Sequence, residues 1–218
     1  MNVNIRQLDI FCKSWLRKAK LYEKPRPIFS LSWVRRPARA GCEGESDSLS
    51  RSFDRFTSLF VVFNRIYTEA GKLLIRRGVI NPPARRRYAP LPDRESATSH
   101  VVTFYGEDRL RDEISSDRKC RQAVDALVQL IRERRFYLHE DYATGLPDMG
   151  RDIRLADEAS TYSPQAILSL IYQARCNLFH GEKDFEERQR VLLDNMSAAL
   201  EFIVLKVLTK LREELMNA

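Results

Sequence analysis

The feature that most constrains the fold is a long run of apolar residues with helical spacing. Between residues 53 and 75 apolar side chains recur every three or four positions, which places them on one face of a helix. Leu59, Val62 and Ile66 widen that face, so we expect a largely buried helix. Asn64 lies beside it and is interpreted as a structural polar residue. The residues of the face are Phe53, Phe56, Phe60, Phe63, Tyr67, Ala70 and Leu74.

The same spacing predicts three further helices, over residues 117–134, from 163 onward, and over 184–214. Asp117 is a good N-cap, and Ser163 followed by Pro164 is a typical helix start. No long stretch alternates with a period of two, which excludes an extensive sheet. We therefore expect an all-α fold, a bundle of four to five helices. No apolar run reaches the 18 or so residues that a membrane span needs.

The basic excess is confined to the N-terminal segment. Residues 1–40 hold ten Lys/Arg and two Asp/Glu, a net charge of +8, whereas the rest holds 27 against 28. A basic helix over 4–22 is expected to dock through Ile5, Leu8, Phe11, Cys12, Trp15 and Leu16. We interpret 24–50 as a linker with one short strand at 28–34. The chain then divides into a basic extension, 1–48, and a helical domain, 49–218.

Arginine and proline dominate a second segment, 76–100, which we expect to be a loop because prolines interrupt helices. Basic segments attract polyanions, of which nucleic acid is the commonest. The alternative is a solvated surface without a ligand. On the first interpretation the weak RNA contacts would come from Lys13, Arg17, Lys18, Arg35, Arg36, Arg85, Arg86 and Arg87.

The four cysteines lie far apart and form no C-x-x-C pair, which argues against a zinc site or a thioredoxin motif. No metal or other cofactor is expected. A reduced, cytoplasmic protein is the simplest interpretation. A secretory signal is not visible, although the Arg-rich N-terminus leaves a mitochondrial transit peptide open. His100 and His139 lie in expected loops and are given no functional role.

The residues best suited to chemistry lie between the last two expected helices. Arg175 is near the end of one helix, His180 follows five positions later, and we expect both to face one groove. An imidazole can take the proton of a ribose 2′-OH, and a guanidinium can hold a phosphate through two hydrogen bonds. Such a pair would cleave RNA, and not DNA, without a metal. The alternative is structural: Arg175 pairs with Glu182, and His180 caps a helix.

The stretch Arg175-Cys-Asn-Leu-Phe-His180-Gly181 resembles the R-x4-6-H motif of the HEPN superfamily. The segment Phe60-Val-Val-Phe-Asn64-Arg-Ile-Tyr67 resembles the Phe-Asn-x-x-Tyr helix of these domains. The resemblance covers roughly residues 50–215, without a counterpart for 1–48 or 76–100. It implies a helical bundle that forms a homodimer, in which two motifs meet in one composite cleft.

Many HEPN proteins are metal-independent endoribonucleases of toxin–antitoxin and anti-phage defence systems. Carried over, His180 would be the general acid/base, Arg175 would hold the scissile phosphate, and Asn177 would orient one of them or touch the RNA. The products would be a 2′,3′-cyclic phosphate and a 5′-OH. The implied partners are RNA, a second copy of the chain and an antitoxin or sensor protein.

Cys176 departs from the family pattern, because active members often carry Asn, Asp or His after the motif arginine. Either Asn177 compensates, or the site is weak or silent. The alternative function is therefore a non-catalytic HEPN-like module that binds RNA, a nucleotide or a protein partner. For the dimer interface we expect the apolar residues that exceed one stripe of the last helix, namely Phe202, Leu205 and Leu208.

Overall fold

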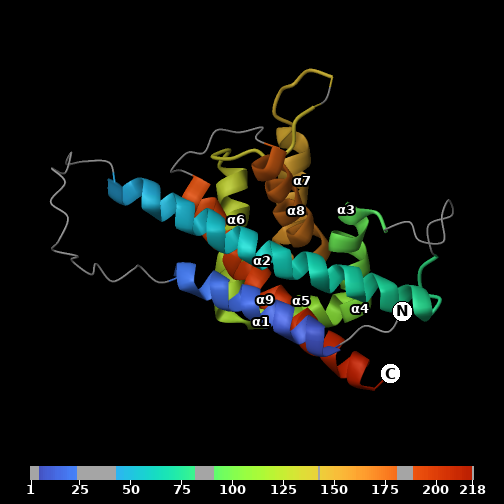
Figure 1. Cartoon of the computed structure of the whole chain (residues 1–218). Coiled ribbons are helices and arrows are strands. Elements are labelled where there is room, and N and C mark those ends of the chain that lie inside the picture. The colour runs from blue at the N-terminus through green and yellow to red at the C-terminus, as the bar shows by residue number, and fades with distance from the viewer. Residues whose placement is uncertain (1–4, 24–42, 82–90, 142, 181–188, 218) are drawn as a thin grey trace, which may run out of the picture.

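The computed structural model describes residues 5–23, 43–81, 91–141, 143–180 and 189–217 (Figure 1). No β-strand occurs in these ranges, where the one extended pairing is an isolated bridge between Glu140 and Pro147. The expected all-α fold is confirmed. No helix of the described ranges is long and apolar enough to cross a bilayer. The elements are α1 (Ile5–Glu23), α2 (Glu43–Arg76), α3 (Asp93–Glu95), the π-helix η1 (Ser96–His100), α4 (Val101–Tyr105), α5 (Glu107–Ser116), α6 (Arg118–Arg132), α7 (Met149–Ala159), α8 (Pro164–His180) and α9 (Gln189–Met216).

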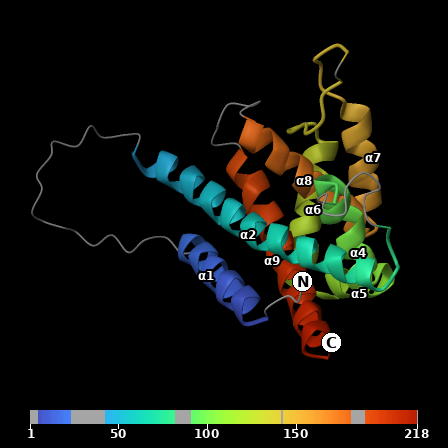
Figure 2. The ribbon, with the colours of Figure 1, turned by 45° about the vertical axis from the view of Figure 1, so that its right-hand side comes forward.

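The two longest helices, α2 and α9, pack against each other at the centre of the bundle. The N-terminal helix α1 packs along α2, and η1 packs against both α2 and α8. On the far side of α9, α6 packs on α9, and α7 joins α6 to α8. Figures 1 and 2 both show α2 between α1 and α8. The helix that ends in the predicted motif therefore lies across α2 from the basic helix.

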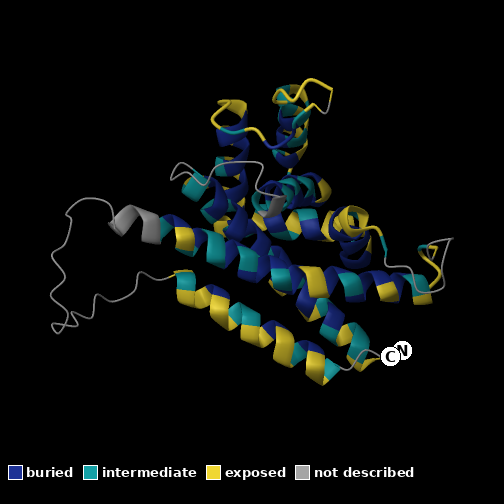
Figure 3. Cartoon of the chain, turned by 45° about the horizontal axis from the view of Figure 1, so that its top comes forward, coloured by how far each residue is buried: buried dark blue, intermediate teal, exposed yellow. Residues whose placement is uncertain are grey.

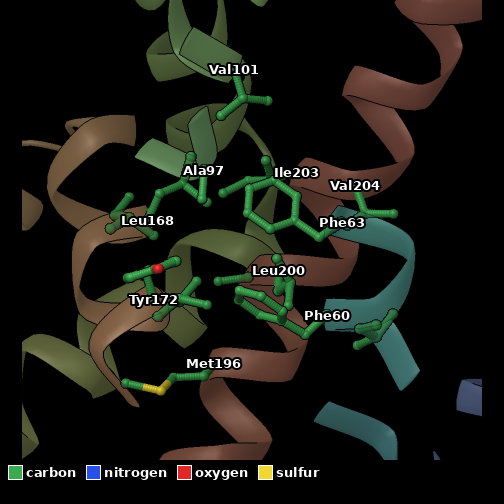
Figure 4. Packing of buried hydrophobic residues seen from close by; sticks show 14 of the residues in the cluster. Phe60, Phe63, Ala97, Val101, Leu168, Tyr172, Met196, Leu200, Ile203 and Val204 are labelled. Carbon is green, nitrogen blue, oxygen red and sulfur yellow. The ribbon is translucent and has the colours of Figure 1, made fainter. Parts of the chain in front are cut away.

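Aromatic and aliphatic side chains of α2, α8 and α9 interlock in the core (Figure 4). The rings of Phe60 and Phe63 meet edge to face, with centroids 5.7 Å apart. Such packing excludes water from the apolar faces, which is the main source of bundle stability. The face predicted on α2 is buried from Phe56 to Leu74, with Phe53 partly buried at its start.

Helix α2 begins earlier than the sequence analysis predicts, at Glu43 instead of Phe53. Residues 43–50, which the sequence analysis assigns to a linker, belong to this helix. Polar contacts with α9 hold this part of the helix: the Ser52 hydroxyl donates to Asp194 at 2.7 Å, and Arg55 pairs with Glu201 at 2.7 Å. A Ser-rich composition resembles a linker in sequence, but these partners lie about 140 residues away. The strand predicted at 28–34 lies outside the described residues.

The expected docking of the basic helix is confirmed. Leu8 and Cys12 of α1 are buried, and the α1 carboxylate Asp9 accepts a hydrogen bond from Arg212 at 2.5 Å. The opposite face is exposed, as Figure 3 shows. Phe11, which was assigned to the docking face, is instead exposed.

The loop expected over 76–100 is shorter in the structure, because α3, at Asp93, opens a helical stretch that continues through η1 and α4. Pro92 directly precedes this stretch, where the fixed φ of proline favours a helix start. The structure also adds α5 and α7, so the helical segments of the described ranges outnumber the four to five expected.

The helix starts with clear capping signals are confirmed. Asp117 accepts a hydrogen bond from the Cys120 backbone N–H at 2.8 Å at the start of α6, and α8 begins at Pro164. The start of the last helix, expected at 184, lies outside the described residues. On α9, Leu205 is 44% exposed, but Leu208 is buried in the core. Leu208 is therefore unavailable for the predicted dimer interface, because it completes the apolar face toward the bundle.

Candidate functional site

Arg175 of the predicted motif lies on α8 at the contact with α2. Its guanidinium carbon is 5.5 Å from the centroid of the Phe60 ring and 6.0 Å from that of Tyr172. The side chain is partly buried. Cation–π contacts of this kind attract a guanidinium to the ring faces without removing its charge. The arrangement therefore keeps a cation near the end of α8.

His180 is the last residue of α8, and its side chain lies outside what the structure describes. Five residues of continuous helix correspond to a rotation of about 500°, so positions 175 and 180 are about 140° apart around the helix axis. The two positions therefore lie on different sides of α8. Their meeting in one groove stays a prediction, and a groove shared by two copies of the chain would be compatible with this spacing.

Asn177 is buried and joins α8 to the loop that precedes α7. Its Nδ2 donates to the backbone carbonyl of Leu138 at 2.7 Å, and its Oδ1 accepts from Gln173 at 2.9 Å. Because a buried carbonyl without a partner is costly, this bond fixes the loop. The amide thus has a structural task, and its predicted role toward Arg175, His180 or RNA stays a prediction.

Two tyrosines beside Arg175 share one carboxylate. Tyr67 donates to Oδ1 of Asp93, and Tyr172 donates to Oδ2 at 2.9 Å. Burial and the bonds to Asp93 raise the pKa of both phenols well above the ordinary value of tyrosine. Both therefore stay protonated as donors at neutral pH, and they hold α3 against α2 and α8.

A cleft of about 530 Å³ opens between α3, the loop around His139, α7 and α8. The α8 side of the cleft consists of Tyr172, Gln173 and Cys176. The motif helix therefore turns Cys176 toward the cleft, whereas Arg175 stacks on Phe60 of α2. Cys176, which the sequence analysis treats as a departure from the family pattern, is a wall residue of this cleft.

His139 and Asp152 form a buried pair in the wall of the same cleft. His139 Nδ1 lies 2.7 Å from Asp152 Oδ1, and Oδ2 accepts from the backbone N–H groups of Leu138 and His139 at 2.6 and 3.2 Å. The sequence analysis gave His139 no role. The two residues are 13 positions apart across a loop, and no periodic pattern or motif connects them. Only the fold could reveal this pair.

The other histidine with an expected structural role, His100, is buried in η1. Its Nδ1 lies 3.4 Å from the Ser96 hydroxyl, and its Nε2 lies 3.9 Å from a carboxylate oxygen of Glu95. Ser96 and Glu95 precede His100 by four and five positions in the same helical stretch. They fit the interpretation of His100 as a satisfied structural residue.

The three predicted RNA contacts that the structure describes lie away from the motif. Lys13, Arg17 and Lys18 are exposed on α1, across α2 from α8 (Figures 1 and 2). Lys18 lies over the Trp15 ring at 4.7 Å, and Lys13 is 3.8 Å from Asp9. The remaining candidates lie outside the described residues, namely Arg35, Arg36, Arg85, Arg86 and Arg87.

Comparison with models of known protein families, with curated proteins and with solved structures finds no match to this chain.

Proposed function

We propose that the chain is a metal-independent endoribonuclease of the HEPN type, which acts as a homodimer in a toxin or anti-phage defence system of the cytoplasm. The observation that carries the proposal is the location of the motif. Arg175 and His180 lie in the last two turns of α8, before the final long helix of an all-helical bundle. The guanidinium of Arg175, which lies over the Phe60 ring, supports the same proposal.

In this mechanism the 2′-oxygen of the RNA attacks the adjacent phosphorus and the bond from phosphorus to the 5′-oxygen breaks. His180 takes the proton of the 2′-OH as general base and, as general acid, returns it to the leaving 5′-oxygen. Arg175 binds the phosphate and stabilises the charge that develops on its oxygens. The products are a 2′,3′-cyclic phosphate and a 5′-OH end.

The alternative is a non-catalytic HEPN-like module that binds RNA, a nucleotide or a protein partner. One observation favours it: Arg175 and Asn177 both have contacts that a purely structural role would explain, namely the rings of Phe60 and Tyr172 and the carbonyl of Leu138. Under this alternative RNA affinity depends on salt, but no RNA is cut.

RNA cleavage by the purified chain with EDTA present distinguishes the two functions. We expect wild type to cut RNA and His180→Ala to lose at least about a hundredfold in rate, because proton transfer contributes that much. Arg154→Ala is the matched control, since it removes an exposed charge on α7 that has no assigned contact with RNA, and it should cut at the wild-type rate. Undiminished cleavage by folded His180→Ala would exclude the proposal, and binding without cleavage by wild type would favour the alternative.

A further inference from the structure

Two arginines of the cleft have no acidic partner. Arg94 of α3 and Arg151 of α7 line the same cleft, and within the described ranges neither guanidinium has an ion pair or a hydrogen bond. Some arginines elsewhere form ion pairs, such as Arg55 with Glu201 and Arg132 with Asp157, both at 2.7 Å. Arg94 is exposed and Arg151 is partly buried. Two guanidiniums that line one cleft offer positive charge to an anion bound there.

The backbone around both arginines is fixed by specific contacts. The carboxylate of Asp93, directly before Arg94, accepts from Tyr67 and Tyr172. At the start of α7, Asp148 accepts from the backbone N–H of Arg151 at 3.0 Å. The backbone segments that hold the two arginines are therefore fixed before a ligand binds. This lowers the loss of backbone conformational entropy on binding.

His139 adds a buried polar atom that lacks a partner. The side chain is 3% exposed, Asp152 holds its Nδ1, and its Nε2 has no hydrogen-bond partner among the described residues. An unsatisfied buried nitrogen is costly, so it calls for an explanation. With Nδ1 bonded to Asp152, Nε2 is the ring nitrogen left for a ligand, to which it can donate only in the doubly protonated ring.

Two carboxylates also line the cleft. Asp141 is engaged in its own loop, where one oxygen accepts from the backbone N–H groups of Ala143 and Thr144 at 2.7 and 3.2 Å. Glu140 has no such bond within the described ranges and would repel an anion. The cleft therefore contains the His139 ring and two guanidiniums that lack an ion pair among the described residues, against two carboxylates, one of them held by backbone N–H groups.

We propose that this cleft is a binding site for a phosphate-class oxyanion, held by Arg94, Arg151 and His139. Guanidinium groups and phosphate oxygens match in charge and in hydrogen-bond geometry. The cleft volume of about 530 Å³ exceeds that of a lone phosphate, so the anion can belong to a larger molecule, such as the phosphorylated end of an RNA. The proposal does not rest on RNA cleavage, because phosphate binding is measured without RNA.

Calorimetric titration of the full chain with inorganic phosphate tests the site. We expect binding in the millimolar range or tighter, weakened about tenfold or more in Arg94→Ala and in Arg151→Ala. Arg154→Ala is the matched control: it removes an exposed arginine of α7 that does not line the cleft, and should leave the dissociation constant unchanged. Glu140→Gln should tighten binding, because it removes the opposing charge.

His139→Asn separates binding from folding. The asparagine amide can keep the hydrogen bond to Asp152 but has no atom in place of Nε2, so the variant should fold and bind phosphate about tenfold more weakly. Absence of phosphate binding by wild type would overturn the proposal. Wild-type affinity in a folded variant with both Arg94→Ala and Arg151→Ala would overturn it as well.

A second titration identifies the source of the phosphate. Two oligoribonucleotides of one sequence, with a 5′-phosphate or a 5′-OH, are compared at constant salt. Tighter binding of the phosphorylated oligomer, lost in Arg94→Ala, supports an RNA end as the ligand. Equal binding of the two oligomers, with inorganic phosphate still bound through Arg94, supports free phosphate.

Discussion

The two sides of α2 differ in how their charges are paired. On the α1 side the charges at the helix contacts have partners: Asp9 with Arg212 at 2.5 Å, and Glu23 with Lys119 at 3.2 Å. On the α8 side the cleft contains unpaired Arg94 and Arg151, within the described ranges, and a histidine nitrogen without a partner.

This difference separates a structural surface from a candidate site. Folding selects for satisfied polar groups, so the α1 side has the pattern expected of a helix that is held in place. Unsatisfied groups that gather in a cleft instead mark places where a ligand completes the structure. The density of basic residues alone would favour the N-terminal segment as the ligand-binding region. The pairing of charges instead favours the cleft beside the motif.

The largest effect is expected from Asp152→Ala on the cleft side. It leaves the backbone N–H groups of Leu138 and His139 and the His139 ring without their acceptor, and should lower the free energy of unfolding by about 3–5 kcal/mol. Asp157→Ala removes the exposed partner of Arg132 on the same helix and should cost less than about 1 kcal/mol. Urea unfolding measures both, and similar losses would show that the buried pair is unimportant.

Leu8→Ala should weaken the packing of α1 on the opposite side of α2. Leu8 is fully buried on the face of α1 that packs against the bundle. Its truncation should therefore lower the free energy of unfolding by about 3 kcal/mol and weaken the packing of α1. Phosphate affinity should stay at the wild-type value, because the cleft lies across α2. The control is Ile10→Ala on the exposed face, with a change within about 0.5 kcal/mol. Loss of phosphate binding in folded Leu8→Ala would mean that the two sides are coupled.

Asn177→Ala should have an intermediate effect, because it strips the Leu138 carbonyl of its hydrogen bond. We expect a loss of about 2 kcal/mol and weaker phosphate binding, since the loop that carries His139 loses its tie to α8. Asn195→Ala, whose amide bonds its own helix at an exposed position of α9, should stay within about 0.5 kcal/mol. Thermal unfolding and calorimetry together report both effects, and a neutral Asn177→Ala would contradict the structural role.

The smallest effect is a pH dependence of the paired charges. Burial raises the pKa of Glu113, but its bonds to Lys206, Arg109 and Tyr105 outweigh burial and lower it overall. A lowered pKa in the folded state gives stability that is present above the unfolded pKa and is lost as pH falls through the folded value. Glu113→Gln should therefore cost up to about 1 kcal/mol at pH 7, less below about pH 4. A difference that grows on acidification would contradict the pairing.

The sequence predicts those parts of the fold that depend on local patterns. Periodic apolar residues predict the burial of α2 from Phe56 to Leu74, and capping residues predict the starts of α6 and α8. The predicted start of α2 is wrong because the polar side chains near its N-terminal end find their partners, Asp194 and Glu201, on a helix that is distant in sequence. The assignment of Leu208 to the dimer interface is wrong for a similar reason: helix periodicity alone does not reveal how many neighbouring helices surround α9.

The candidate site is predictable only where a motif marks it. Arg175, Asn177 and His180 follow from the resemblance, whereas Arg94, His139 and Asp152 carry no signal of their own. They lie on α3, a loop and α7, and come together only when Asn177 and Asp93 fix those segments to α8. Contacts of this kind join residues far apart in sequence, which a single-sequence pattern does not encode.

The central proposal is that the chain cleaves RNA by attack of the RNA's own 2′-hydroxyl group on the neighbouring phosphate. The most direct measurement compares an oligoribonucleotide with a copy that carries a single 2′-deoxyribose at the cleaved position, using the purified chain with EDTA. We predict that wild type cuts the first and leaves a 2′,3′-cyclic phosphate, that it does not cut the second, and that His180→Ala cuts neither. Cleavage of the deoxy-substituted copy at the same position, or cleavage that needs a metal, would contradict the account.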